Sequence, residues 1–361
     1  MANANADTPP KAKRRELIPG ALIGRLSDLD EPLPHSIKRW FFAWGSIPGF
    51  FFMVQISTGI MLTFFYQPSP ETAYESVRFI TEEVRYGWFI RSIHMWSANL
   101  MILFVFLHST RVLITGGYRG KGRWATWMFG MTMLILTLLL AFTGYSLIYE
   151  QLSYWGITVA ANINSYIPLI GPPLADFVRY GAEINAKTVS RMFAIHTFLL
   201  PPALALLTAG HIFFIRKFGL HVPGNADDIK AEEELQKKKG PYHFFPQHAL
   251  AELVVFLYLG VVLILLAMAY PVEMGEQANP LVTPEHIKPE WYFYATFRWL
   301  KIFPGQVGIL MLGAVAAIGF GWPFIDKQLQ KLAPKLELAM WLGALGVITM
   351  VGMTLLEAIS K

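Results

Sequence analysis

The chain has 361 residues, of which 54% are hydrophobic and only 15% are charged, and it contains no cysteine. Soluble domains carry about 25% charged residues, so this composition excludes an ordinary soluble enzyme. Without cysteine the chain forms no disulfide, binds no thiolate-held iron–sulfur cluster and lacks the attachment motif of c-type haem. The net charge of +5 comes from basic residues scattered between apolar runs, a pattern that argues against a nucleic-acid partner.

Seven apolar stretches reach about 20 residues, the length that crosses about 30 Å of hydrocarbon. In chain order they cover residues 40–66, 89–110, 124–149, 192–215, 251–270, 305–325 and 338–357. We therefore predict an all-α transmembrane fold with seven membrane helices. The first four form an N-terminal bundle, and three more helices follow it.

The polar pieces between these stretches indicate domains and orientation. Residues 1–36 contain the basic run KAKRRE and no apolar core, which predicts a cytoplasmic arm and no cleaved signal peptide. With seven crossings, 20 of the 30 Lys and Arg residues fall on the side of this arm. The positive-inside rule then places the N-terminus in the cytoplasm and the C-terminus outside. The polar connection around residue 225 predicts a boundary between a domain at 37–224 and one at 225–361.

Four histidines lie inside two of the predicted membrane helices, where ionisable side chains are costly and usually functional. They are His94 and His108 in 89–110, and His196 and His211 in 192–215. At about 100° and 1.5 Å per residue, separations of 14 and 15 keep each pair near one helix face and about 21–22 Å apart. Facing helices then offer two bis-histidine haem sites: His94 with His196 on an outer iron, and His108 with His211 on an inner iron.

Glycines repeat the same spacing in the other two helices of the predicted bundle. Gly45 and Gly59 lie in 40–66, and Gly130 and Gly144 lie in 124–149, each pair 14 residues apart. Glycine lets a backbone approach a flat macrocycle closely. Without the histidines, such pairs would indicate only helix packing.

Arginines bracket the histidines at three or five residues, where haem propionates would point: Arg91, Arg111, Arg191 and Arg216. Arginines at helix ends also serve as orientation signals or snorkelling side chains, and the sequence leaves both functions open. Pro201 and Pro202 remove backbone hydrogen bonds and predict a bend in 192–215, which would explain its spacing of 15. The other histidines, His35, His221, His243, His248 and His286, lie in polar segments and receive no ligand role.

Taken together, these residues resemble cytochrome b, the quinol-oxidising core of cytochrome bc complexes, from about residue 30 to 357. Beside the histidine and glycine pairs, the resemblance rests on RSIHMWSANL, TGYSLIYEQLSYWG and KPEWYF, which occur in the family's order. The seven helices, the wider second histidine spacing and the polar break are more similar to cytochrome b6 joined to subunit IV than to the mitochondrial type. The resemblance implies a fused, b6-type chain in the bacterial cytoplasmic membrane.

In that family the PEWY motif lies at the outer quinol-oxidation pocket. The resemblance therefore gives Pro289, Glu290, Trp291 and Tyr292 a quinone-binding role, with Glu290 and Tyr292 as catalytic residues. An acid in an aromatic, apolar loop is partly desolvated, which would help Glu290 accept a quinol proton. By spacing alone, the same carboxylate would rather stabilise the start of a short helix after Pro289.

Further positions follow from the resemblance with less specific motifs. Gly156 matches a pocket-lining glycine, and Arg216 matches in position a polar residue near the inner quinone site. Asp28 and Asp30 are placed to relay protons there, although acids in a solvated arm need no such role.

Two positions depart from the family pattern. The b6 family carries a cysteine near the start of its first helix that holds an extra inner haem. Ala43 occupies this position, so no covalently attached extra haem is expected. The family's Pro-Trp after the TGYSL-like stretch is replaced by Ile148 and Tyr149, followed by Glu150, which changes the shape expected for the outer pocket.

The resemblance implies two non-covalent b-type haems and bifurcated quinol oxidation. One electron passes to a Rieske iron–sulfur protein, and the other passes through the outer and inner haems to a quinone at the inner site, with protons released outside and taken up inside. Lacking cysteine, this chain holds only the second branch. A Rieske partner, a c-type cytochrome acceptor and a homodimer within a membrane complex follow, and the chain would be the cytochrome b subunit of a quinol–cytochrome c reductase.

Two other functions stay open from the sequence. A dihaem membrane anchor of a dehydrogenase or hydrogenase needs two haems and one quinone site, but no outer PEWY loop. A secondary transporter also carries polar residues inside the membrane, although an odd number of helices without an inverted repeat argues against it.

Overall fold

A computed structural model describes residues 32–35, 44–181, 183–220, 226–240, 242–285, 287–334 and 336–360. The described chain is mostly helical, with a single pair of two-residue strands among these ranges. Most of the predicted N-terminal arm lies outside the described residues, as do Asp28, Asp30, Ala43, His221 and His286.

Seven helices of the described chain are long and apolar enough to cross a membrane. They are α2 (Ser46–Thr63), α4 (Gly87–Ile114), α5 (Arg123–Ser146), the continuous run of α8 (Ala186–Ala194), η3 (Ile195–Leu199) and α9 (Leu200–Phe218), the run of η4 (Phe244–His248) and α11 (Ala249–Ala269), α13 (Gly305–Leu332) and α14 (Leu338–Ile359). Each overlaps one of the seven predicted segments, so the predicted all-α class with seven spans is confirmed.

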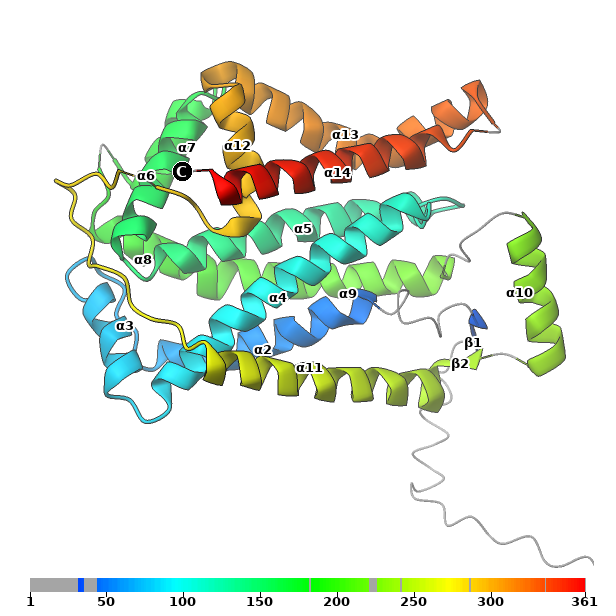
Figure 1. Ribbon diagram of the computed structural model, residues 1–361, viewed down its shortest axis with the longest axis horizontal. Coiled ribbons are helices and arrows are strands. Elements are labelled where there is room, and N and C mark those ends of the chain that lie inside the picture. The colour runs from blue at the N-terminus through cyan, green and yellow to red at the C-terminus, as the bar shows by residue number, and fades with distance from the viewer. Residues whose placement is uncertain are drawn as a thin grey trace, which may run out of the picture.

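Shorter elements cover the two ends of the helical bundle (Figure 1). One end, here called the α12 end, carries α3 (Ala73–Glu82), α6 (Gln151–Ser165), α7 (Gly171–Arg179), η5 (Trp291–Phe293) and α12 (Tyr294–Ile302). The opposite end, the α10 end, carries α10 (Ala226–Lys239), β1 (Pro32–Leu33) and β2 (Tyr242–His243). The strands pair antiparallel, with Pro32 opposite His243 and Leu33 opposite Tyr242.

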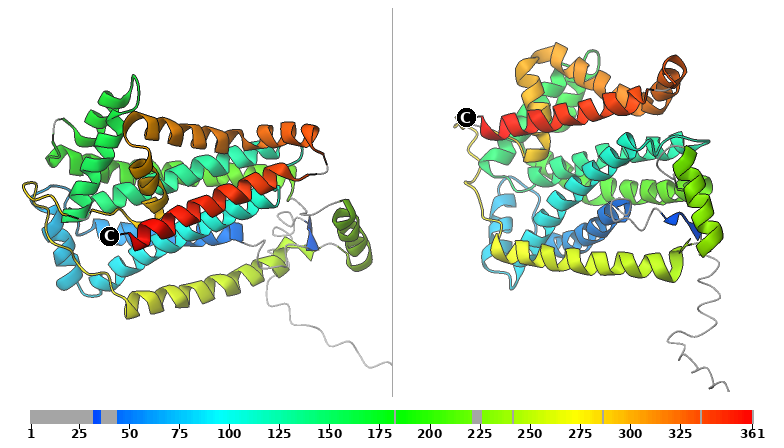
Figure 2. Two further views of the ribbon diagram at one scale, coloured as in Figure 1. Left: turned by 45° about the horizontal axis from the view of Figure 1, so that its top comes forward. Right: turned by 45° about the vertical axis from the view of Figure 1, so that its right-hand side comes forward.

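The spanning helices pack in pairs that then join. Helix α2 lies along α4, and α5 lies along α9, while α11 packs on α4 and α2. Helices α13 and α14 pack against each other, and they contact α5 and α4 respectively (Figures 1 and 2). Helix α11 follows residue 225 but packs on α4 and α2, which precede it. The parts of the chain before and after the predicted domain boundary are therefore in contact. The division at 224/225 stays a prediction.

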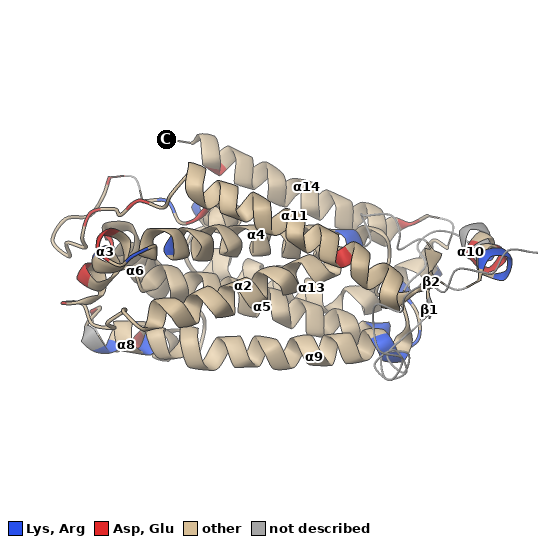
Figure 3. Cartoon of the chain, turned by 90° about the horizontal axis from the view of Figure 1, so that it is seen from below, with Lys and Arg blue, Asp and Glu red and all other residues tan. Residues whose placement is uncertain are grey.

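The surface and the interior of the bundle are both apolar. Only 6 to 22% of the most apolar window of each spanning helix is buried, so most of the apolar surface faces outward, as in a protein solvated by lipid. Charged residues gather toward the two ends (Figure 3). This distribution makes the chain an integral membrane protein.

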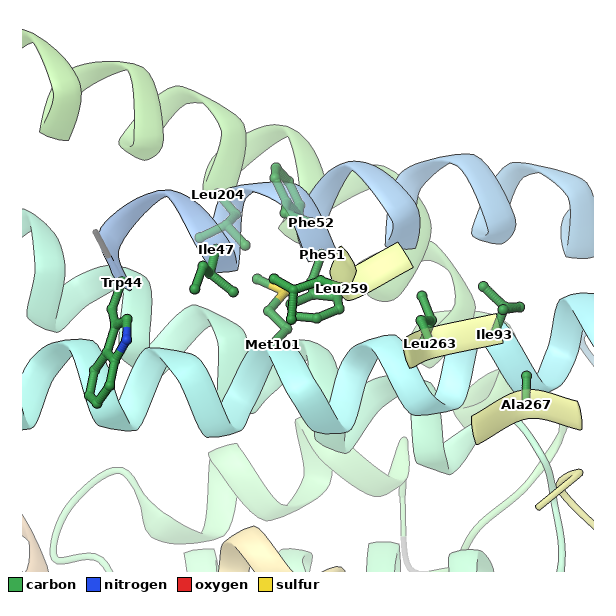
Figure 4. Close-up of a cluster of buried hydrophobic side chains, with 10 residues drawn as sticks. All are labelled: Trp44, Ile47, Phe51, Phe52, Ile93, Met101, Leu204, Leu259, Leu263 and Ala267. Carbon is green, nitrogen blue, oxygen red and sulfur yellow. The ribbon is translucent and has the colours of Figure 1, made fainter. Parts of the chain in front are cut away.

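The largest buried cluster joins α2, α4, α9 and α11 (Figure 4). Phe51 of α2 is fully buried between Met101 of α4 and Leu259 of α11, and Leu204 of α9 closes the cluster. Side chains of this size stabilise the fold by about 1.5–3 kcal/mol each when removed from water. In lipid the corresponding gain comes from close packing, and it fixes how α4 and α9, the two helices that carry the histidines, lie relative to each other.

Local chemistry sets several helix ends. Gly122 has a φ of 78° directly before α5, and Gly219 has a φ of 70° directly after α9, a backbone conformation that glycine adopts without strain. Asn185 begins α8 with a capping box: its side chain accepts a bond from the Lys187 N–H, and Thr188 bonds back to the Asn185 N–H. The Asn185 cap and Gly219 bound the helical run α8–η3–α9, which carries His196 and His211.

Candidate functional site

His94 of α4 and His196 of η3 face each other inside the bundle. Their ring centroids lie 6.5 Å apart, and the rings are inclined by 74°. Two imidazoles that bind opposite sides of one metal, each through a bond of about 2 Å, require a centroid separation of about 6 Å. The pair therefore has the spacing of two axial ligands to one iron.

Hydrogen bonds fix which nitrogen of each ring carries the proton. The Thr58 hydroxyl donates to the Val54 carbonyl at 2.7 Å and lies 2.8 Å from His94 Nδ1. Because its own proton is engaged, this hydroxyl accepts from Nδ1–H. His196 Nδ1 lies 3.1 Å from the Leu140 carbonyl, which can only accept. In both rings Nε2 is left with a free lone pair, the arrangement that outer partners impose on metal-binding histidines.

The second pair lies on the same two helices, about 21 Å further along at 1.5 Å per residue. His108 belongs to α4 and His211 to α9. Nδ1 of His108 is buried and has no hydrogen-bond partner. The second pair thus differs from the first, in which both Nδ1 atoms have hydrogen-bond partners.

A π turn explains the unequal histidine spacing. In η3 the Leu200 N–H donates to the Ile195 carbonyl, five residues back. A π turn holds one residue more than an α turn, so 15 residues in this helix cover nearly the same rotation as 14 in α4. Pro201 lacks an N–H, and its ring excludes the carbonyl four residues earlier. The interruption expected at Pro201 and Pro202 thus takes the form of a π turn directly before them.

The four glycines with histidine spacing lie against the four histidines. A Cβ built on Gly144 would lie 2.6 Å from the His196 ring, and one on Gly45 would lie 3.2 Å from the His108 ring. The equivalent distances are 3.4 Å from Gly59 to His94 and 3.5 Å from Gly130 to His211. Each histidine therefore has a bare backbone beside it, and the missing Cβ gives the imidazole ring the room that it occupies.

Together these residues fit a pair of bis-histidine haems. The first pair offers two imidazole nitrogens with free lone pairs, and a glycine backbone lies beside each of the four rings. Over the part of the chain that the structure describes, no group of three or more His, Cys, Asp or Glu could hold a metal ion. A cofactor that brings its own equatorial ligands and takes only two from the protein matches this donor set.

The bracketing arginines occupy different surroundings. The Arg91 guanidinium donates to the carbonyls of Val272 at 2.8 Å and Glu273 at 3.1 Å, which fastens the connection after α11 to α4. Arg191 lies over the rings of Phe177 and Tyr180, with its guanidinium carbon 4.6 and 4.3 Å from their centroids. Arg111 and Arg216 occupy the last turns of α4 and α9. Their predicted contact with propionates, and the role of Arg216 at an inner quinone site, stay predictions.

Three of the four PEWY residues, Pro289, Glu290 and Trp291, line cavities at the α12 end, whereas Tyr292 is not among the lining residues of either cavity. The first cavity, of about 410 Å³, is lined by Tyr145, Leu152, Lys288, Pro289, Glu290, Trp291 and Tyr294. The second, of about 400 Å³, lies against α4 and is lined by Met95, Trp96, Asn99, Leu100, Leu103, Val272, Glu290 and Trp291. Glu290 and Trp291 line both, so the two cavities adjoin at these residues. Trp291 is held there because its Nε1–H donates to Asn99 Oδ1 at 2.6 Å.

Electrostatics at this end favour neutral forms of the PEWY acid and phenol. Burial raises the pKa of Glu290, and the nearby charge of Glu150 raises it further. Burial also raises the pKa of Tyr292 far above its usual value, with smaller contributions from Glu290 and Tyr145. Tyr292 therefore stays a neutral phenol, while Glu290 is an acid that exchanges its proton nearer to neutral pH.

Three residues at this site had no role in the sequence prediction. Tyr145 lines the first cavity, and Gly156 lies behind it, so that a Cβ on Gly156 would be 3.5 Å from the Tyr145 ring. Asn99 holds Trp291. Glu150 places Oε1 3.9 Å from the Arg91 guanidinium, and this oxygen is buried without a hydrogen-bond partner. For Glu150 the signal was its place directly after Ile148 and Tyr149, which depart from the family pattern.

The sequence also matches known proteins. Residues 29–219 match the family described as cytochrome b/b6/petB, and residues 277–360 match its C-terminal counterpart, cytochrome b (C-terminal)/b6/petD. The chain belongs to the cytochrome b family. The two matches have the order expected for a b6-type part joined to a subunit IV-like part.

Individual members of the cytochrome b family agree with this assignment. A cytochrome bc complex cytochrome b subunit of Chlorobaculum thiosulfatiphilum is 36% identical over 302 residues, which cover 81% of this chain and 68% of that protein. A cytochrome b of Bugula neritina is 34% identical over 305 residues, with coverages of 83% and 80%. A solved structure of a hyperthermophilic respiratory Complex III has a TM-score of 0.79 at 23% identity, over 94% of this chain and 89% of that chain, and shares its fold.

Proposed function

We propose that this cytochrome b is the dihaem subunit of a bc-type quinol–cytochrome c oxidoreductase. The observation that carries the proposal is the His94–His196 pair, 6.5 Å apart with both Nδ1 atoms engaged. His108 and His211 lie about 21 Å further along the same helices. The relative from Chlorobaculum thiosulfatiphilum, named as a subunit of a cytochrome bc complex, supports this assembly. A Rieske protein, a c-type cytochrome and a second copy of this chain complete it.

Each residue of the site has a defined task in this proposal. Bound b-type haem supplies one-electron transfer along the axis of the bundle. His94 and His196 hold one such group at the α12 end, His108 and His211 hold the other toward the α10 end, and Thr58 and Leu140 orient the outer rings. The four glycines let the backbones of α2 and α5 lie close to the histidine rings.

At the α12 end the chain itself handles the proton of quinol oxidation. A quinol that occupies the cavity beside Tyr145 gives up a hydroxyl proton as it loses electrons to the one-electron acceptors of the complex. The quinol O–H bond breaks and a new O–H bond forms on the ionised Glu290 carboxylate. Tyr292 remains protonated, and Trp291 closes the pocket on the side of α4. Reduction of a quinone at the α10 end, near Arg216, completes the proposed reaction.

The two alternative functions lose support. Membership of the cytochrome b family argues against a secondary transporter. A dihaem anchor needs only one quinone site and no PEWY loop, whereas in this chain Glu290 of the PEWY motif lines two cavities at the α12 end.

A haem count with one ligand variant tests the proposal. The purified chain should contain two b-type haems by pyridine haemochrome assay, with no c-type signal. His196→Ala should lose one haem and quinol-driven turnover, because a six-coordinate site loses one of only two protein ligands. Phe198→Ala, in the same π turn but with a side chain that is 72% exposed, should keep both. Full haem content and turnover in His196→Ala would contradict the assignment.

A further inference from the structure

The last turn of α14 carries a carboxylate with no exposed surface. Glu357 is 0% exposed, although it belongs to a membrane-spanning helix, where ionisable residues are expensive and usually functional. Its partners come from α12. Lys301 Nζ lies 2.5 Å from one carboxylate oxygen, and Arg298 Nη1 lies 3.8 Å from the other. These two cations compensate the buried charge, as a buried carboxylate requires.

The backbone of the same turn binds a third cation. Lys288 Nζ donates to the carbonyl of Glu357 at 2.9 Å and to the carbonyl of Ser360. The last carbonyls of a helix have no partner within the helix, and they favour a cation. Lys288 directly precedes the PEWY residues in the chain and lines the first cavity.

The turn around Glu357 therefore contacts the chain on both sides of the PEWY residues. Lys288 lies just before Pro289, while Arg298 and Lys301 lie on α12, the helix that follows Tyr292. The sequence gives no sign of this contact, because Lys301 and Lys288 lie 56 and 69 residues away from Glu357. Two cations, Arg298 and Lys301, lie at the carboxylate, so the contact with α12 depends on the charge of Glu357, whereas Lys288 is held by backbone carbonyls of the same turn.

We propose that Glu357 is a positioning residue of the outer quinol pocket. Resting on the function proposed above, it fixes the loop of Glu290 and Trp291 by holding Lys288 on one side and α12 on the other. Misplacement of a reacting group by about 1 Å can cost about 100-fold in rate, so a clamp at both flanks of this loop matters for binding and for proton transfer. Glu357 contacts neither cavity and acts only through these residues.

The test compares Glu357→Gln with Glu337→Gln in the assembled complex. Glutamine keeps the volume but removes the charge that compensates Arg298 and Lys301. With short-chain ubiquinol and menaquinol analogues as probes, we expect Glu357→Gln to raise KM for quinol about tenfold by partial release of the loop, with a smaller change in kcat. Glu337, at the other end of α14 and with a 55% exposed side chain, should keep the wild-type KM.

A positioning role and a purely structural role differ in this measurement. A purely structural role lowers the amount of assembled complex and its haem content but leaves KM unchanged, and that result overturns the proposal. An exchange of charges, Glu357→Lys with Lys301→Glu, should restore KM toward the wild-type value. If Glu357→Gln does not assemble, Glu357→Asp, which keeps the charge and shortens the side chain, replaces it in the test. A raised KM for quinol in Glu357→Asp supports the positioning role, and an unchanged KM overturns it.

The same experiment separates this proposal from the proposed function. If the wild-type complex does not reduce its haems with quinol, the function itself fails. If the wild type is active and Glu357→Gln has an unchanged KM with full haem content, only the positioning role fails.

Discussion

At the α12 end, the charge of Glu150 affects the pKa of Glu290. Burial raises the pKa of Glu290, and the charge of Glu150 raises it further. Glu290 can accept a quinol proton only when ionised, so the rate of quinol oxidation should rise as the pH rises through this raised pKa. Glu150→Gln removes the neighbouring negative charge and lowers the pKa of Glu290, while burial continues to act. The rising limb of the pH profile should therefore move to lower pH in this variant.

The measurement for Glu150 is the pre-steady-state rate of haem reduction by quinol as a function of pH. Glu290→Gln should lower that rate by about 100-fold or more, because it removes the proton acceptor. Glu276→Gln is a matched control, since Glu276 is an exposed acid in the connection that Glu150 contacts. A limb that stays at the same pH in Glu150→Gln, or one that moves equally in Glu276→Gln, would refute the coupling.

At the scale of single elements, the π turn of η3 keeps the two histidine pairs in phase. One residue deleted from a regular α-helix rotates everything beyond it by about 100°. Deletion of Leu206, in the regular part of α9 and 75% exposed, should therefore turn His211 away from His108 and remove one haem. Deletion of Phe198 should convert the π turn into an α turn and leave a spacing of 14, as in α4. Both haems should then remain, at some cost to the helix from Pro201.

Haem content and reduced-minus-oxidised spectra of the two deletions decide the point. Both remove one exposed apolar residue from the same membrane helix, so effects of length and insertion are matched. Equal loss of haem in the two variants would mean that the π turn has no part in aligning the histidines.

The membrane helices and the facing histidines could be predicted from the sequence, whereas the π turn could not. The membrane helices were predictable because apolar length is a signal carried by consecutive residues. The facing of His94 and His196 followed from helical periodicity, with no need for contacts across the chain. The π turn was not predicted, since two prolines indicate an interruption of the helix but not its hydrogen-bond pattern.

Contacts between distant parts of the whole molecule were beyond the sequence. The sequence did not indicate that Arg91 binds carbonyls 181 and 182 residues away, while its contact with a propionate stays a prediction. Glu357 carries no motif, and its role depends on which helix packs beside α14. Such pairings depend on the tertiary arrangement of helices, which apolar patterning alone does not specify.

One such pairing joins the two halves of the chain at the α10 side of the bundle. Arg119, between α4 and α5, makes a bidentate pair with Asp326 of α13 at 2.7 and 2.9 Å, and it also bonds to Glu337 before α14 at 2.8 Å. Asp326 is 2% exposed. The burial of the adjoining Tyr118 and the charge of Asp326 raise the pKa of Tyr118 to about 12. This network holds α13 and α14 against the helices that carry the histidines.

Asp326→Ala should destabilise the whole molecule without emptying the histidine sites. Removing one partner of a buried pair leaves an uncompensated charge and costs about 3–5 kcal/mol, whereas Glu337→Gln breaks an exposed pair and should cost less than about 1 kcal/mol. Thermal unfolding of the solubilised chain, followed by tryptophan fluorescence, measures the difference. Because His94, His108, His196 and His211 lie on α4, η3 and α9, the b-haem spectrum should persist in Asp326→Ala below its unfolding transition. Equal transitions in the two variants would show that Arg119 does not join the halves, and loss of haem before unfolding would show that the histidine sites depend on α13 and α14.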